Sequence, residues 1–188
     1  MLGFGTEKIE EDLEEYLPDG KVQRMDLDTT RSKSSYQKII SDFENGHTSI
    51  LVGTQMVTKG LDFDNVSLVG ILNADKMMNY PDFRSLERSF QIMTQVAGRA
   101  GRKKKRGRVL IQTYNPEHWL LDMVIKGDYQ AFYEKEIKER YQFSYPPFMR
   151  LMKITIKHKE EEVAQRAASA ISKLLQPQLI DRIVGPEK

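Results

Sequence analysis

The chain has 188 residues, of which 39% are hydrophobic and 30% charged, with a formal net charge of +2. This balance is too apolar for a disordered protein, and no apolar run approaches the roughly 18 residues that span a bilayer. The absence of cysteine excludes disulfides, thiolate metal sites and a cysteine nucleophile. Because no secretory signal opens the chain, we expect a cytoplasmic protein with no membrane partner.

The first part of the chain alternates helical patterns with short apolar runs. Apolar periodicity predicts helices over residues 6–17, where Thr6 is a candidate N-cap, and over 34–45, where Asn45-Gly46 is the stop. Strands are predicted over 21–27, 49–53 and 66–72.

The next elements continue this alternation and then change in style. A long helix is predicted from residue 81 to the Gly98–Gly101 region, followed by a strand over 108–113. Strands that alternate with helices predict a mostly parallel sheet of the α/β class, whose ligands sit at the carboxyl ends of the strands. Beyond residue 117 the predicted elements are helices over 119–125, 129–141 and 160–175 and an edge strand over 151–156.

A domain boundary is predicted among residues 143–148, where Tyr145-Pro146-Pro147 stops the preceding helix. We therefore assign residues 1–143 to the first domain and its trailing helices, and residues 144–188 to the start of a small α+β domain. The second piece is too short to be stable by itself, and Gly185-Pro186-Glu187-Lys188 is typical of a chain cut short. We expect a truncated domain here.

The sharpest chemical pattern is Gln95-Val96-Ala97-Gly98-Arg99-Ala100-Gly101-Arg102. Its two arginines, three residues apart, share a helical face, and the small residues around them let that face approach another surface. A planar guanidinium matches phosphate oxygens, as an arginine finger requires. A basic helix end that offsets its own macrodipole is the alternative that these residues leave open.

A second pattern, from Val52 to Phe63, directly follows a predicted strand. Its glycine and hydroxyl residues can present donors to phosphates, and Asp62 can accept hydrogen bonds from a ribose. The glycine spacing does not match a phosphate-binding loop, so this segment alone favours an ordinary loop.

Together the two patterns resemble motifs V and VI of the superfamily 2 helicases. Further short segments narrow the resemblance to the replication-restart, or primosomal, DNA helicases, and the resemblance extends over essentially the whole chain. These segments are Gly5-Thr6-Glu7, Leu27-Asp28-Thr29-Thr30, Gly53-Thr54-Gln55-Met56, Thr58-Lys59-Gly60, Asp82-Phe83-Arg84-Ser85, Gln95 through Arg102, Tyr145-Pro146-Pro147 and Gly185-Pro186. The resemblance implies a RecA-like parallel sheet flanked by helices, the C-terminal lobe of a helicase.

The resemblance also implies roles at a nucleotide. Arg102 would be the finger that reaches the γ-phosphate of ATP held by the first RecA-like lobe, with Arg99 beside it and Gln95 ordering the cleft. Gly60 and Asp62 would contact the nucleotide or couple it to DNA.

Three residues would contact DNA on the same basis. Thr54 and Gln55 would touch the phosphate backbone of the single strand, and Lys59 is a weaker candidate for the same contact. Phosphate contacts position a strand without reading its sequence, which suits a translocating enzyme.

Two sequence motifs of a complete helicase are missing from this chain. It contains neither a Walker A loop nor a D-E-x-H box, so ATP and magnesium would be held mainly by the first lobe. We therefore expect a fragment that does not hydrolyse ATP alone. Zinc is expected only in the full-length protein, and no metal is assigned here because His47, His118 and His158 show no ligand spacing.

The resemblance implies an ATP-dependent enzyme of replication restart and primosome assembly. Its partners would be single-stranded and branched DNA, the first lobe of the same chain, primosome proteins and single-strand-binding protein. Two alternatives stay open: the lobe of another superfamily 2 DNA translocase, and a non-catalytic module that binds nucleic acid through the basic run 103–106, for which a solvated turn is somewhat favoured.

The aromatic residues from Tyr141 to Phe148 also allow two interpretations. They can stack on bases, or they can pack at a hinge between domains. From the sequence, hinge packing is the favoured interpretation.

Overall fold

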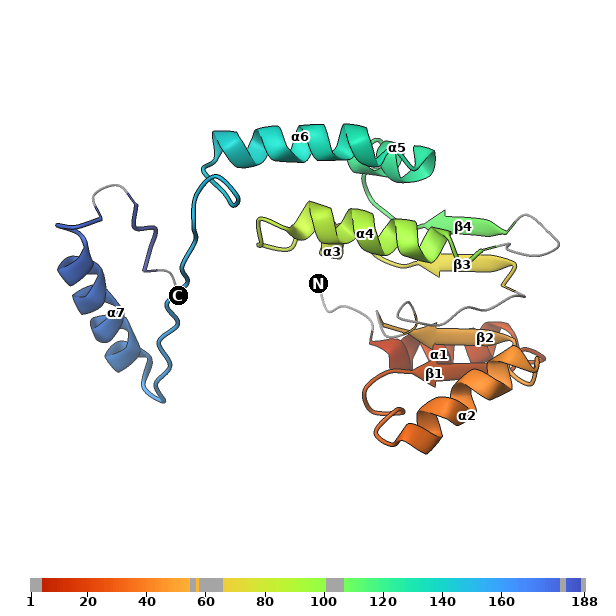
Figure 1. Ribbon diagram of the computed structural model, residues 1–188. Helices are drawn as coiled ribbons and strands as arrows, with labels where there is room; N and C mark the ends of the chain where they lie inside the picture. The colour runs from red at the N-terminus through yellow and green to blue at the C-terminus, as the bar shows by residue number, and fades with distance from the viewer. Residues whose placement is uncertain (1–4, 55–56, 58–65, 101–106, 180–181, 187–188) are drawn as a thin grey trace. The chain divides into compact units, whose positions relative to one another are not determined.

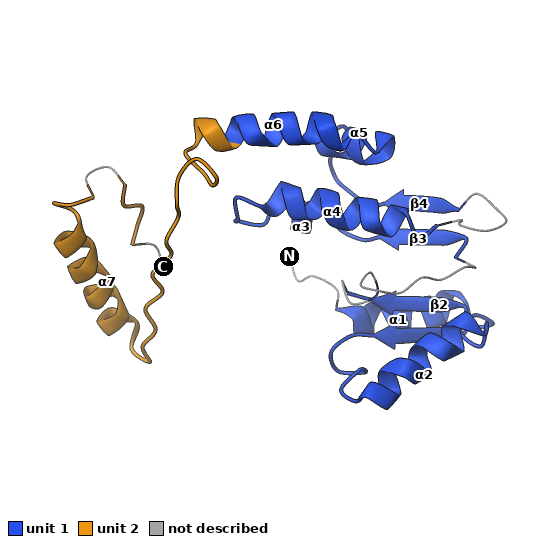
Figure 2. Cartoon of the chain, in the orientation of Figure 1, with its two compact units in different colours: residues 1–139 blue, residues 140–188 orange. Residues whose placement is uncertain are grey.

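The computed structural model describes residues 5–54, 57, 66–100, 107–179 and 182–186 (Figure 1). It divides the chain into two compact units, residues 1–139 (unit 1) and 140–188 (unit 2), as Figure 2 shows. The domain boundary predicted after residue 143 lies close to this division and stays a prediction.

The elements of the described residues follow one another in an alternating order. They are α1 (Thr6–Tyr16), β1 (Val22–Met25), α2 (Lys33–Glu44), β2 (Ile50–Gly53), β3 (Leu68–Ile71), α3 (Ala74–Met78), α4 (Ser85–Ala97), β4 (Arg108–Ile111), α5 (Trp119–Lys126), α6 (Tyr129–Gln142) and α7 (Glu161–Leu175). Within the described part of the chain, none of these helices has the length and apolar character needed to cross a membrane.

The predicted α/β alternation is confirmed by two parallel strand pairs. In the first pair, β1 lies beside β2, with Val22 opposite Ile50 and Met25 opposite Gly53. Helix α2 connects these two strands and places Ile39 against the fully buried Met25. Because the strands are parallel, the residues that follow both of them lie at one edge, the carboxyl edge of this pair.

The second pair is formed by β3 and β4, which are also parallel, with Ile71 opposite Ile111. Helices α3 and α4 form the crossover between them. The chain leaves β3 at the carboxyl edge and returns through this crossover to the amino edge, where β4 begins (Figure 1).

The main core of unit 1 gathers around α4. The Phe90 ring stacks on Phe132 of α6, with centroids 4.4 Å apart and an interplanar angle of 12°. Met93, one turn further along, is completely buried. The buried members of this core come from α3, α4, α5 and α6 and are Ala74, Met78, Phe90, Met93, Leu120, Leu121, Val124 and Phe132. Burial of such side chains stabilises by about 1.5–3 kcal/mol each.

Two predicted helix starts differ from the structure. Helix α1 has Gly5 at its N-cap and no side-chain cap, because the Thr6 hydroxyl donates to Asp26 instead. Helix α4 begins at Ser85 rather than near residue 81, because the Asp82 carboxylate accepts the Arg84 N–H at 2.9 Å and holds a turn before the helix.

Unit 2 contains helix α7, which confirms the helix predicted over residues 160–175. The edge strand predicted over residues 151–156 was wrong, because the segment pairs with no described strand. Leu151, Met152 and Ile154 are all more than half exposed. Alternating apolar residues gain nothing from the strand conformation when no partner edge or apolar layer covers them.

Gly53 provides a test of the close packing at the end of β2. A Cβ atom at this position would lie 2.6 Å from the Met25 carbonyl oxygen and would also collide with Val57. We expect Gly53→Ala to lower the free energy of unfolding by about 1–3 kcal/mol, as overpacking does. Thermal and urea unfolding followed by circular dichroism measure the change.

Gly70 of β3 is the matched control, because a Cβ atom there would meet nothing within 4 Å. Gly70→Ala should leave the unfolding transition almost unchanged. Equal stability of Gly53→Ala and Gly70→Ala would contradict the steric argument.

Candidate functional site

Three of the eight predicted site residues lie in the described part of the chain: Thr54, Gln95 and Arg99. The remaining five lie outside the described residues, as does the basic run 103–106. They are Gln55, Lys59, Gly60, Asp62 and Arg102.

Gln95 and Arg99 lie one turn apart at the end of α4. Gln95 is exposed and Arg99 is half-buried. The helical turn continues past Ala97, because the N–H of Gly98 donates to Thr94 at 3.0 Å and the N–H of Arg99 donates to Val96 at 3.0 Å. Residues four apart on a continuous turn share a face, so the amide and the guanidinium lie on the same side of the helix end.

The opposite face of α4 fixes this helix end in place. Phe90, Met93 and Val96 are buried on it at helical spacing. Two hydroxyl groups strengthen the same helix, since Ser89 donates to the Ser85 carbonyl and Thr94 to the Phe90 carbonyl, both at 2.7 Å. A functional side chain on a rigid element loses less conformational entropy when it binds a ligand.

Gln95 and Arg99 lie at the end of the crossover helix α4, before the chain enters β4. The sequence pattern predicts ligands at the carboxyl ends of the strands. Thr54 directly follows the carboxyl end of β2, whereas Arg99 follows a helix.

Thr54 is exposed directly after Gly53, where the backbone of β2 approaches that of β1 closely. The parallel register places Met25 opposite Gly53, so Asp26 and Thr54 are the next residues on neighbouring strands. The carboxyl edge of this pair therefore carries a hydroxyl donor beside a carboxylate.

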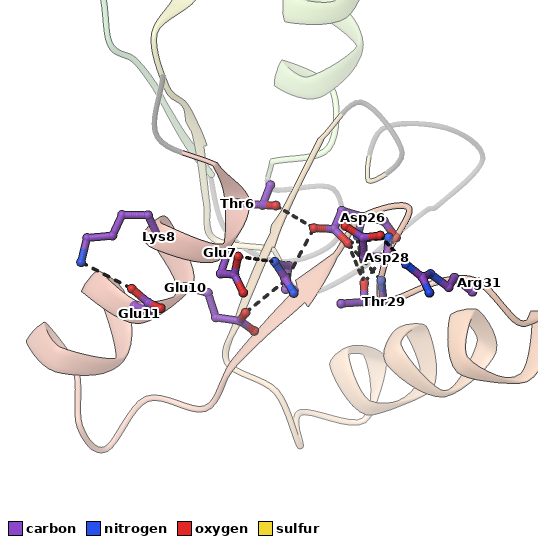
Figure 3. A network of polar contacts seen from close by, with 10 residues as sticks. Thr6, Glu7, Lys8, Glu10, Glu11, Asp26, Asp28, Thr29 and Arg31 are labelled. Carbon is purple, nitrogen blue, oxygen red and sulfur yellow. Dashed lines mark hydrogen bonds and ion pairs between the residues drawn. The ribbon is translucent and has the colours of Figure 1, made fainter. Parts of the chain in front are cut away.

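Asp26 is the centre of the polar network in Figure 3. Its Oδ2 accepts a hydrogen bond from the Thr6 hydroxyl at 2.7 Å, and its Oδ1 accepts the N–H groups of Asp28 and Thr29, both at 3.0 Å. The Arg24 Nε lies 3.5 Å from Oδ2 and 3.3 Å from the Glu10 carboxylate. One carboxylate thus joins the start of α1 to the turn after β1.

The environment of Asp26 favours its ionised form. Burial by itself raises the pKa of the carboxyl group, but hydrogen bonds from the Thr6 hydroxyl and from two backbone N–H groups outweigh it. The positive charge of Arg24 acts in the same direction, and the pKa lies below its ordinary value.

The sequence patterns did not identify Asp26 as an organising residue. Its main partner, Thr6, is 20 positions away, so no local pattern connects the two residues. The available signal was the Asp-x-Asp-Thr-Thr word, since carboxylates and hydroxyls directly after a strand favour hydrogen bonds to backbone N–H groups.

The chemistry of the α4 end suits anionic phosphate. A guanidinium and a primary amide supply hydrogen-bond donors in fixed directions, and the guanidinium keeps its charge at every physiological pH. Among the described residues, no group of three or more histidine, aspartate and glutamate side chains is placed to hold a metal ion.

The comparison with family models assigns the chain to a class. It belongs to the family described as the helicase conserved C-terminal domain, which matches residues 4–104, more than half of the chain. The two parallel strand pairs with their crossover helices are those of a RecA-like helicase lobe.

Individual relatives carry one recurring name, Replication restart protein PriA. The chain is 49% identical over 170 residues to the protein of Bacillus subtilis, with 90% of this chain and 21% of the relative covered. It is 40% identical over 189 residues to that of Synechocystis, with 99% and 23% covered, and 38% identical over 186 residues to that of Haemophilus influenzae, with 98% and 26% covered. The chain therefore spans about a fifth to a quarter of the length of these curated relatives.

Substitution of Asp26 tests the network and its pH dependence. Asp26→Asn removes the charge and one strong acceptor, and should lower the free energy of unfolding at neutral pH by roughly 1–3 kcal/mol. Because the folded pKa is depressed, this contribution is fully present above the ordinary aspartate pKa of about 3.9 and is lost as pH falls through the folded value. Urea unfolding at several pH values measures the difference.

Asp28→Asn is the matched control, because its side chain is exposed and pairs with the exposed Arg31 at 3.0 Å. It should change stability little at any pH. A difference between wild type and Asp26→Asn that stays constant down to the lowest pH would contradict the titration argument.

Proposed function

We propose that this chain is the second RecA-like lobe of an ATP-dependent DNA helicase that acts in replication restart and primosome assembly at branched DNA. Family membership supports the helicase lobe, and similarity to proteins named for replication restart supports the biological role. The observation that carries the proposal is the fixed end of α4, which presents Gln95 and Arg99 on one face.

The nucleotide role follows from the donors at this helix end. Arg102 reaches the γ-phosphate of ATP as the arginine finger, Arg99 supports it, and Gln95 orders the cleft. Gly60 and Asp62 contact the nucleotide or couple it to DNA. The Walker A loop, which binds the phosphates, is not in this sequence. ATP is therefore bound mainly by the first lobe, and this chain alone does not hydrolyse ATP.

Magnesium also belongs to the first lobe, where it neutralises charge on the phosphates. The donors of this chain fit the same phosphates, because an amide and guanidinium groups bind anionic oxygens. Zinc is proposed for the full-length protein only, since this chain contains no cysteine.

DNA contacts come from the segment that follows β2. Thr54, Gln55 and Lys59 bind the phosphate backbone of the single strand without reading its sequence. Thr54 has the exposure and the position at a strand end that this contact needs.

The two sites act together in a cycle. ATP binding draws the lobes together and brings the arginine to the γ-phosphate, and hydrolysis lets the lobes separate. The two lobes hold the DNA strand tightly in alternation during this cycle. The other proposed partners are primosome proteins and single-strand-binding protein, and the proposed location is the cytoplasm.

The arginines are tested in the longer parent protein. Arg102→Ala should reduce DNA-stimulated ATP hydrolysis by about a thousandfold or more while nucleotide binding is largely retained, because a finger acts in the transition state. Arg99→Ala should reduce it by a smaller factor. Turnover and nucleotide affinity are measured separately, by phosphate release and by equilibrium titration.

Arg166→Ala is the control, because this arginine is exposed on α7 of unit 2. Its turnover should equal that of the wild type. Unchanged turnover in Arg102→Ala would reject the finger and leave the DNA-binding module as the better account.

The alternative module is also tested by DNA titration of this chain at two salt concentrations. A module that binds through its basic run predicts a large loss of affinity on Arg102→Ala and a steep decrease with salt. The helicase lobe predicts weak binding and little loss from this variant.

A further inference from the structure

Unit 2 begins at residue 140 (Figure 2). Four aromatic side chains in its first residues are exposed. The exposed fractions are 71% for Tyr141, 61% for Phe143, 36% for Tyr145 and 45% for Phe148. Aromatic rings usually bury most of their surface when their role is packing. These rings instead leave large flat areas available.

The four rings form two pairs. Tyr141 and Phe148 meet edge to face, with centroids 5.1 Å apart and an interplanar angle of 80°. Phe143 and Tyr145 are tilted at 37° with centroids 6.2 Å apart. Neither arrangement is a face-to-face stack, so the two rings of a pair do not cover each other's faces.

Backbone hydrogen bonds hold the rings in a folded segment. The N–H of Tyr145 donates to the Arg140 carbonyl at 2.8 Å, and the N–H of Phe148 donates to the Tyr145 carbonyl at 3.0 Å. The Arg140 guanidinium donates to the Pro146 carbonyl at 3.4 Å and closes the same turn. The rings are therefore positioned before any ligand arrives, which lowers the entropy lost on binding.

The charged side chains within this segment have one sign. Residues 140–159 contain no aspartate or glutamate, and acids resume only at Glu160 before α7. The cations of this stretch are Arg140, Arg150, Lys153, Lys157 and Lys159. Exposed rings interleaved with cations and free of acids complement a polyanion that carries flat groups.

We propose that this segment, residues 140–159, is a stacking site for the unpaired bases of single-stranded DNA. Aromatic faces accept any base, so the contact is independent of sequence and suits a translocating enzyme. The cations bind the phosphates between the stacked bases. The inference rests on the proposed function for its partner, but it uses unit 2 and a different kind of contact from the phosphate contacts of Thr54.

Equilibrium binding of a fluorescently labelled oligothymidylate to this chain tests the proposal. Phe143→Leu and Phe148→Leu keep apolar volume and remove the flat ring, and each should weaken binding about fivefold or more. Phe148→Tyr keeps a ring and should retain the affinity. Tyr16→Leu is the control, because Tyr16 is 80% exposed on α1 of unit 1, and it should bind like the wild type.

An oligonucleotide made of abasic sites distinguishes contacts with the bases from contacts with the phosphates. Under the proposal, wild type binds it more weakly than oligothymidylate, and the leucine variants bind it as the wild type does. The dependence on salt should be equal in wild type and leucine variants, because no phosphate contact is lost, whereas Lys153→Ala should reduce it.

Leucine variants that bind oligothymidylate as tightly as the wild type would overturn the stacking site. Hinge packing predicts this result, together with a lower unfolding temperature. Circular dichroism shows whether each variant keeps the helical content of the wild type. A failure here leaves the loss of ATP hydrolysis in Arg102→Ala unaffected, so the two proposals fail separately.

Discussion

The structure of unit 1 depends on the burial of one face of α4. Phe90 and Met93 insert into the core formed with α3, α5 and α6, and the stack of Phe90 on Phe132 fixes the rotation of the helix. That rotation decides which residues remain outside. Gln95 is exposed because Phe90, Met93 and Val96 occupy the buried face of the helix, so hydrophobic packing decides which polar side chains of α4 face outward.

Sequence periodicity predicted the strands and most helices because burial repeats at short intervals. It missed α3, whose five residues are too few for a periodic pattern, although Ala74 and Met78 are buried. It also predicted a strand over residues 151–156, because alternation specifies a face but not the partner that would cover it. Both errors have one cause, since local patterns carry no information about distant neighbours.

In the candidate site, too, local features could be predicted from the sequence and features that depend on distant residues could not. Gln95 and Arg99 could be identified from spacing, because their chemistry is local to one helix. The role of Asp26 could not, because it depends on Thr6, 20 positions earlier, and on backbone N–H groups that any sequence supplies.

Helix α1 illustrates how differently two helices of one unit are held. It fully buries none of its residues, whereas α4 buries four. Its attachment to β1 includes the ion pair of Glu10 with Arg24 and the hydroxyl bond from Thr6 to Asp26. Local opening of such a helix exposes little apolar surface. The backbone amides of α1 should therefore exchange with solvent hydrogen through partial unfolding, whereas those of α4 should exchange only when the whole core unfolds.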